Sequence, residues 1–316
     1  MKQEDRMAES ATDQGDIQRV DEVWGDPDNW AAEGWHWTHL PAIHRMNNRH
    51  VTGDPDLSAL AWFFERVARE QSLPLDRALV LACGGGHLER LLRSSGWARE
   101  VVAIDLSPRS LATAEETAKA QGLTGIRYQI GDMNRLDVVG PFDAVFNVSA
   151  SHHCSNLEGL FDVVKRVLKP GGWFFTDDFV GPSRFQWSDL QVLQINRLLQ
   201  MLPDRFVHSR SGWCRRGFYR NDAKVVADFD PSEAVRSAEI LPLLHRHFHV
   251  ETCRGYGGGL LHLALANVAH TFDPEQTGDP TGPAYLDLLI EASDHLRRTG
   301  RTQDDFAVAI ARHPKS

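Results

Sequence analysis

The sequence has few of the features that mark secreted, zinc-binding or membrane proteins. Its four cysteines are scattered and form no Cys-x-x-Cys pair, so we expect neither a disulfide framework nor a structural zinc site. No apolar run approaches the roughly 20 residues that a membrane helix needs, and the N-terminal residues lack the apolar stretch of a signal peptide. These absences predict a soluble protein of the reducing cytoplasm with no membrane partner.

Basic residues are also in the minority. The chain of 316 residues contains 34 Lys and Arg against 43 Asp and Glu, a formal net charge of −9. Without a basic stripe, binding to nucleic acid is disfavoured. Residues 1–28 hold nine of the acids and only three basic residues. The remainder is therefore nearly neutral, as is typical of an enzyme with a small-molecule substrate, and a hydrophobic content of 42% allows a sizeable core.

Composition and pattern divide the chain into six segments. The second of them carries Trp24, Trp30, Trp35 and Trp37, and burying a large apolar side chain is worth roughly 1.5–3 kcal/mol. This segment therefore either covers a flank of the core or forms a lid over the active site. The segments are an acidic, disordered tail (1–22), the Trp- and His-rich segment (23–56), a core (57–180), an insertion (181–238), the closing strands of the core (239–270) and C-terminal helices (271–316).

Strand-type and helix-type runs alternate through the core. An amphipathic helix begins near Leu57. This alternation predicts an α/β fold with a doubly wound, mostly parallel sheet. Residues 247–269 read as two strands around a glycine turn, which would close the sheet with an antiparallel strand. The β-type runs of the core lie directly before the glycines at 84–86 and at 101–105, 126–132, 142–150 and 173–179.

Three consecutive glycines, Gly84 to Gly86, stand where a strand passes into a helix. Glycine allows a sharp turn and a close approach of a ligand, and the helix N-terminus offers unpaired N–H groups. Asp105 ends the next strand, 19 residues after Gly86, where a carboxylate can accept both hydroxyls of a ribose. Asp132 and Met133 follow the third strand, where an adenine would lie. We therefore expect an adenosine cofactor, and the glycine spacing does not fit a dinucleotide.

Five motifs in register give the chain a family resemblance over residues 78–180. The chain resembles the class I S-adenosylmethionine-dependent methyltransferases, and its flanks resemble a subgroup from bacterial glycan and natural-product pathways. The resemblance implies a Rossmann-like fold, S-adenosyl-L-methionine as cofactor, and cofactor contacts from Ala82, Gly84, Gly86, Asp105, Leu106, Asp132, Met133 and Asn147. The motifs are LVLACGGG, VVAIDLS, IGDMNRL, FDAVFNVSASHH and LKPGGWFF.

The first motif departs from the family pattern at two positions. Val80 stands at the usual acid and Ala82 at the first glycine. Ala82 still offers its backbone carbonyl to the amino group of the cofactor. With the acid missing, the ammonium of the methionine moiety needs another partner, for which Glu89 or a residue of the Trp-rich segment is a candidate.

Candidate catalytic groups follow the fourth strand, whose carboxyl end faces the ligand crevice in this fold. His152 and His153 stand there, and a free pKa of about 6.5 suits a base at neutral pH. His153 has an alternative role in ordering the loop. We expect no metal site, because adjacent side chains project in different directions and no second cluster has ligand spacing. Further candidates are Tyr219 for catalysis and His36, Trp37, Asp178, Trp213 and Arg216 for the substrate, with residues 181–238 building the acceptor pocket.

These observations predict a small-molecule methyltransferase that methylates a hydroxyl of a sugar or secondary metabolite. Three alternatives stay open. They are N-methylation, a non-methylating reaction of the same cofactor such as aminocarboxypropyl transfer or cyclisation, and a non-catalytic adenosine-binding module. The expected partner is a small-molecule acceptor, and the sequence leaves a homodimer open.

Overall fold

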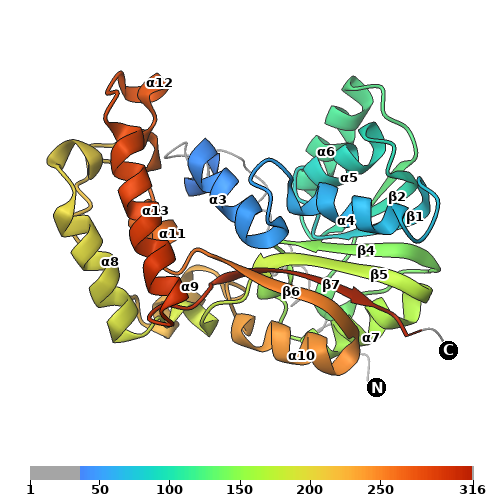
Figure 1. Ribbon diagram of the computed structural model, residues 1–316. Coiled ribbons are helices and arrows are strands. Elements are labelled where there is room, and N and C mark those ends of the chain that lie inside the picture. The colour runs from blue at the N-terminus through green and yellow to red at the C-terminus, as the bar shows by residue number, and fades with distance from the viewer. Residues whose placement is uncertain (1–35, 315–316) are drawn as a thin grey trace.

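The computed structural model describes residues 36–314, which are built around a seven-stranded sheet (Figure 1). The strand order is β3-β2-β1-β4-β5-β7-β6. Only β7 runs antiparallel to its neighbours β5 and β6, whereas the pairs among β1 to β5 are parallel. The predicted fold class, a Rossmann-like, mostly parallel sheet with an antiparallel closing strand, is therefore confirmed. The strands are β1 (Leu75–Leu81), β2 (Ala98–Asp105), β3 (Ile126–Ile130), β4 (Phe142–Val148), β5 (Leu168–Phe179), β6 (His249–Gly257) and β7 (Phe306–Arg312).

Helices cover both faces of the sheet because the strands present apolar side chains on both sides. On one face Phe63 of α4 is fully buried against Phe146 and Phe175 of the central strands. On the other face Phe161 of α7 packs on Phe174. The helices of the first face are α4 (Ala59–Ala68), α5 (His87–Ser94) and α6 (Pro108–Ala120), and those of the second are α7 (Leu157–Val167) and α10 (Ile240–His247) (Figure 1).

The closing strands differ from the prediction. Residues 247–269 form one strand, β6, followed by the short helix α11 (Leu261–Ala264), and the antiparallel strand β7 comes from residues 306–312. The C-terminal segment is therefore helical only in its first part. An apolar run can be a buried helix or a buried strand, and here Leu260, Leu261 and Ala264 fill a separate helical core. Val308 and Ile310 instead enter the core of the sheet.

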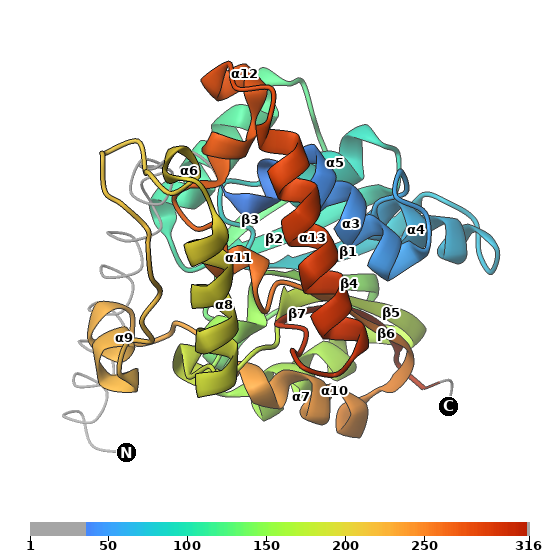
Figure 2. The ribbon, with the colours of Figure 1, turned by 60° about the vertical axis from the view of Figure 1, so that its left-hand side comes forward.

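A second layer of helices packs beside the sheet around its own apolar cluster. In Figure 2, α8 (Asp189–Met201) and α13 (Gly282–Arg298) stand on either side of α11. Helix α3 (Pro41–Thr52) joins this layer to β6 through the bond between His50 Nδ1 and the Tyr256 carbonyl, at 3.0 Å. None of the helices within residues 36–314 has the length and apolar character of a membrane-spanning segment. The remaining helices are α9 (Ala223–Phe229) and α12 (Pro274–Thr277), and the short 3-10 turns are η1 (Trp37–His39), η2 (Met133–Arg135), η3 (Ser151–His153), η4 (Ser183–Phe185), η5 (Asp204–Phe206), η6 (Ser237–Glu239) and η7 (Ala269–Phe272).

The Trp- and His-rich segment is only partly described. Trp24, Trp30 and Trp35, like the acidic tail, lie outside the described residues. Trp37 is buried in the helical layer, where its ring lies 5.8 Å from that of Phe306. This placement of Trp37 corresponds to packing on the flank of the core.

Candidate functional site

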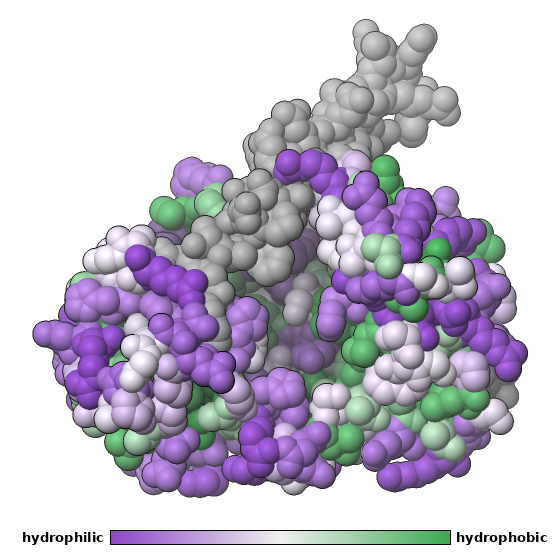
Figure 3. All heavy atoms as spheres, turned by 90° about the horizontal axis from the view of Figure 1, so that it is seen from above, coloured by the Kyte–Doolittle hydropathy of each residue, from purple (hydrophilic) through white to green (hydrophobic). Residues whose placement is uncertain are grey.

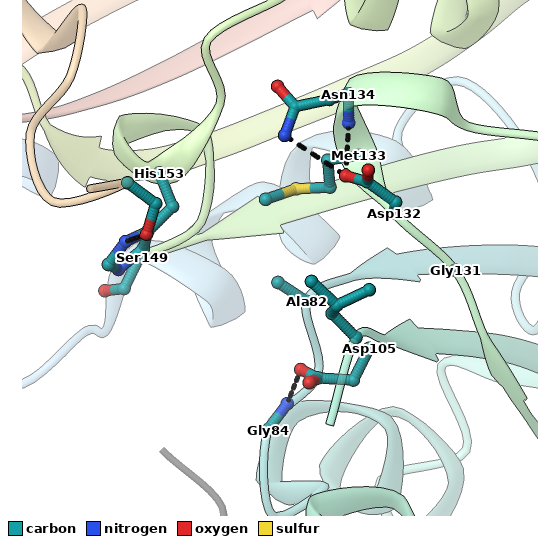
Figure 4. A pocket seen from close by; sticks show the side chains of 11 residues that line it. Ala82, Gly84, Asp105, Gly131, Asp132, Met133, Asn134, Ser149 and His153 are labelled. Atoms are coloured by element: carbon teal, nitrogen blue, oxygen red, sulfur yellow. Dashed lines mark hydrogen bonds between the residues drawn. The ribbon is translucent and has the colours of Figure 1, made fainter. Parts of the chain in front are cut away.

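The loops that follow β1, β2, β3 and β4 surround one cavity at the carboxyl ends of these strands (Figure 4). Seen from above, the described residues enclose a central hollow (Figure 3). Six of the predicted cofactor residues line the cavity, together with one of the two candidate histidines. The lining residues are Ala82, Gly84, Asp105, Leu106, Gly131, Asp132, Met133, Asn134, Ser149, His153 and Ser232.

Asp105 closes the glycine turn. Its two carboxylate oxygens accept hydrogen bonds from the backbone N–H groups of Gly84 and Ser107, each at 2.8 Å. The side chain is 9% exposed and lines the cavity. A carboxylate oxygen can accept more than one hydrogen bond, as the binding of ribose hydroxyls by Asp105 would require.

The turn itself is built from left-handed backbone. Gly84 has a φ of 53° and Gly86 a φ of 81°, and Ala82 adopts a φ of 44° although it is not glycine. Such conformations are concentrated at functional sites. Gly86, a predicted cofactor residue, does not line the cavity. It allows close packing, because a Cβ atom there would lie 2.5 Å from both the Ala114 Cβ and a Glu89 carboxylate oxygen.

Glu89 does not reach the cavity either. Its side chain is fully buried, and its two carboxylate oxygens have no hydrogen-bond partner among the described residues. Burial raises the pKa of Glu89 to about 7. Glu89, on α5, packs against Gly86 and not into the cavity. In this structure it therefore does not face the space where a ligand amino group would lie.

The loop after β3 supplies the opposite wall of the cavity (Figure 4). Asp132 accepts hydrogen bonds from the backbone N–H of Asn134, at 2.8 Å, and from its Nδ2, at 3.1 Å. Asn134 in turn accepts a bond from the backbone N–H of Ser155, at 2.8 Å. The Met133 side chain points into the opening. This loop therefore presents both an acid and an apolar side chain, as predicted.

Asn147, a predicted cofactor contact, turns its side chain into the protein. Its side chain is fully buried and is not part of the cavity lining. The Asn147 amide donates to Thr176 Oγ1 at 2.7 Å and to Asp178 Oδ2 at 2.8 Å, and its oxygen accepts from Ser151 Oγ at 2.7 Å. Asn147 on β4 is directly opposite Thr176 on β5. This register directs its amide to protein groups. The residue therefore holds Asp178 in place.

His152 is paired with Asp178. The His152 Nδ1 and Asp178 Oδ1 atoms lie 2.6 Å apart, and Asp178 is 1% exposed. The backbone N–H of Ser151 also donates to Asp178 Oδ2, at 2.7 Å. Burial lowers the pKa of His152, but the charge and hydrogen bond of Asp178 outweigh burial, so the net shift is upward. Burial raises the pKa of Asp178, whereas the facing imidazole and the hydrogen bonds to the carboxylate lower it below its ordinary value.

His153 lies beside His152 and lines the cavity. The two rings are 4.1 Å apart at an angle of 41°. Both Nε2 atoms approach the Glu233 carboxylate, at 3.8 Å for His152 and 4.0 Å for His153. The expectation that adjacent histidines diverge is thus wrong here, because both stand on the tight turn η3. Burial, and then the charge of His152, lower the pKa of His153 to about 4.

Three residues predicted from the insertion lie elsewhere, as does His36. Tyr219 is 85% exposed and Trp213 is 50% exposed, and neither lines the cavity. Arg216 donates to the Leu202 carbonyl at 2.7 Å and pairs with Asp204. It therefore caps the end of α8. His36 Nδ1 lies 2.7 Å from Thr38 Oγ1 and is outside the lining.

The insertion reaches the cavity through residues 230–233 instead. Ser232 lines the cavity and its Oγ lies 3.0 Å from His153 Nδ1. The sequence signal for this segment is the acidic run DPSE, which stands within the flank DPSEAVRS. Nothing in the sequence marks Asn134 or Ser149 as cavity residues, because polar residues after a strand are common in loops.

The central part of the chain matches a known family. Residues 79–176 match the family described as "Methyltransferase domain". Residues 79–176 therefore form a methyltransferase domain, in agreement with the family that the sequence motifs resemble. The cavity lies within this methyltransferase domain, except for Ser232, which lines it from outside the matched range.

Individual proteins resemble the methyltransferase domain and its surroundings. The "Probable phthiotriol/phenolphthiotriol dimycocerosates methyltransferase 2" of Mycobacterium ulcerans is 32% identical over 147 residues, 46% of this chain and 53% of that protein. The "Ubiquinone biosynthesis O-methyltransferase" of Rhizobium etli is 28% identical over 198 residues, 62% of this chain and 75% of that protein. A solved S-adenosylmethionine-dependent methyltransferase of Mesorhizobium loti is 22% identical with a TM-score of 0.44, covering 81% of this chain and 98% of that chain. The match thus spans about half the length of the first relative.

Proposed function

We propose that this chain transfers the methyl group of S-adenosylmethionine to a hydroxyl oxygen of a small molecule, a sugar or another secondary metabolite. One observation carries the proposal. The glycine turn closed by Asp105 and the histidine turn η3 border the same cavity, through Gly84 on one side and His153 on the other. A methyl donor bound in this cavity would therefore lie beside the histidine turn, on which the ring of His152 is 4.1 Å from that of His153.

The residues around the cavity fit the cofactor. A Cβ atom added at Gly84 would meet no atom within 4 Å, so the glycine leaves open space for a ligand against the turn. Asp105 would accept the ribose hydroxyls, and Met133 and Leu106 would enclose the adenine. When bound, S-adenosylmethionine supplies an electrophilic methyl group to this space.

The protein's own contribution to the reaction is positioning and proton removal. Asp178 accepts a hydrogen bond from the Nδ1–H group of neutral His152, which leaves the lone pair of His152 Nε2 to accept the hydroxyl proton. A positioned base typically contributes about 10²–10⁴-fold to the rate. Asn147 and the Ser151 N–H keep Asp178 ionised and fixed. We assign His152 as the general base and Asp178 as its positioning residue.

The relatives support the coarse class of the reaction. One is named for methylation of phthiotriol and phenolphthiotriol dimycocerosates, and another for an O-methylation in ubiquinone biosynthesis. Both names concern organic small molecules, and the second concerns an oxygen acceptor. We therefore favour a hydroxyl over an amine as the methyl acceptor here.

The test is to identify the products. The full chain is incubated with S-adenosylmethionine and with panels of hydroxylated sugars, phenols and primary amines, and the sulfur product is identified by mass spectrometry. S-adenosylhomocysteine together with a methylated hydroxyl compound supports the proposal. Methylthioadenosine, methylation confined to the amines, or bound cofactor without any product would each overturn it.

A further inference from the structure

Three side chains beside the cavity converge in a way that proton removal alone does not require. One ligand atom each from His152, His153 and Glu233 lies within 4.8 Å of the other two. The Nε2 atoms of both imidazoles face the Glu233 carboxylate. Within residues 36–314 that carboxylate receives no hydrogen bond, although only 15% of its side chain is exposed. It is therefore a largely buried carboxyl group that faces two imidazole nitrogens, and burial raises its pKa.

A second contact fixes each of the two imidazole rings and the loop that carries Glu233. His152 Nδ1 is fixed by Asp178 at 2.6 Å and His153 Nδ1 by Ser232 at 3.0 Å. Arg184 anchors the loop that carries Glu233, through bonds to the Glu233 carbonyl at 3.0 Å and the Pro231 carbonyl at 2.6 Å. Histidines that bind a metal almost always donate their second ring N–H to such a partner, which orients the ring and raises its basicity.

The spacing and charge of the cluster suit a divalent ion. Two ligand atoms that bind zinc at 2.0–2.1 Å in a tetrahedral site lie about 3.4 Å apart. The two Nε2 atoms lie 3.8 and 4.0 Å from oxygens of Glu233. A small rotation of the side chains would bring these distances to the value for a zinc site. Asp230 Oδ2 lies 3.9 Å from His153 Nδ1 and adds negative charge beside the cluster.

We propose that His152, His153 and Glu233 form a binding site for a divalent transition-metal ion of the zinc class. Imidazole with one carboxylate favours zinc, iron, cobalt or nickel over magnesium and calcium, which prefer oxygen ligands. Three protein ligands leave a position open toward the cavity that His153 and Ser232 line.

The site overlaps the base assigned above, and this consequence rests on the proposed function. The ion and the hydroxyl proton need the same lone pair on His152 Nε2. A bound ion therefore excludes proton removal by His152, so zinc should inhibit methyl transfer in competition with the acceptor. It should leave the affinity for S-adenosylmethionine unchanged, because the Asp105 side of the cavity does not contribute a ligand.

Metal binding itself is measured without cofactor or acceptor. The full chain is titrated with Co²⁺, followed by the visible absorption of the ion, and with Zn²⁺ by calorimetry. The expected result is one equivalent bound, with affinity at least tenfold weaker in Glu233→Gln and in His153→Gln. His245→Gln is the matched control, since His245 is exposed on α10, and it should bind as the wild type does.

Three results would overturn the inference. The wild type could fail to bind one equivalent of metal, or Glu233→Gln could bind it with the same affinity as the wild type. A spectral change confined to His245→Gln would place the ion on the surface. Failure of the proposed function is separate, because a chain that forms no methylated product would still bind the metal through these residues.

Discussion

The Oδ1 atom of Asp178 lies 2.6 Å from the Nδ1 atom of His152, with the aspartate 1% exposed. The two residues come from different parts of the chain, the end of β5 and the turn after β4. Their contact depends on the parallel pairing of β4 with β5, which places Val148 beside Asp177. The sheet register thus brings together the pair on which the proposed proton transfer depends.

Replacing His152 should slow methyl transfer without affecting the cofactor. We expect His152→Gln to lower kcat by about 10²–10⁴-fold while the dissociation constant of S-adenosylmethionine changes only a few-fold. His153→Gln, in which the neighbour of the base is lost, should have a much smaller effect. The measurement is single-turnover kinetics with a hydroxyl acceptor. A larger loss in His153→Gln than in His152→Gln would transfer the base role to His153.

The pH dependence of the rate distinguishes the two histidines independently. The base must be neutral to accept a proton, so activity falls as pH drops through its pKa. Asp178 raises the pKa of His152 above its ordinary 6.5, whereas burial and the charge of His152 lower that of His153 to about 4. We expect kcat/KM to decline on the acid side at a pH above 6.5. A profile that stays flat down to pH 5 would contradict the assignment of His152.

The same pair makes stability depend on pH. The pKa of Asp178 is lowered in the folded state, so its contribution is present above the unfolded carboxyl pKa and is lost as pH falls through the folded value. The pKa of His152 is raised, so its contribution is present below about 6.5 and is lost as pH rises through the folded value. The stabilisation by the pair is therefore largest between the ordinary pKa values of Asp and His.

Asp178→Asn tests this window. The substitution should lower the free energy of unfolding by roughly 1.5–3 kcal/mol, as for a hydrogen bond to a charged group, near pH 5.5. The loss should shrink at pH 9. Denaturant unfolding of both proteins at the two pH values measures it, with exposed Asp76→Asn as control. A loss that is the same at both pH values would mean that the pair is not ionised.

Gly86 tests the packing of the glycine turn. Alanine there brings a Cβ atom to 2.5 Å from Ala114 Cβ at a φ of 81°, and such strain costs about 1–3 kcal/mol. Gly85→Ala is the control, because its added Cβ meets nothing within 4 Å. Thermal unfolding should show a clear loss of stability for Gly86→Ala only. Equal stability of the two variants would refute the close approach of α5 and α6.

The local pattern of the sequence predicts the core of the sheet and the part of the site formed by the loops after β1, β2 and β3. Glycines at 84–86, Asp105 and Asp132 stand at strand ends, and parallel strands bring such ends to one edge. The pattern failed for 306–312, whose apolar residues fit either a helix or a buried strand until the neighbouring strand is known.

The part of the site formed by His153 and residues 230–233 depends on tertiary packing. Glu233 lies 80 residues beyond His153, and no local rule connects them. Asn147 shows the converse, since its position at the end of the fourth strand suggests a ligand contact while its register with Thr176 turns its amide toward Asp178. Tyr219 and Trp213 are predicted pocket residues because they lie in the insertion after the fifth strand, but the fold leaves them exposed.

Binding of S-adenosylmethionine tests the central claim most directly. In calorimetric titrations, Asp105→Ala should bind the cofactor at least about tenfold more weakly than the wild type, because it loses charge-assisted hydrogen bonds worth roughly 1.5–3 kcal/mol each. Asp105→Asn should lie between them, and Asp76→Asn should match the wild type. Wild-type protein that does not bind S-adenosylmethionine, or Asp105→Ala with unchanged affinity in a folded state, would contradict the account.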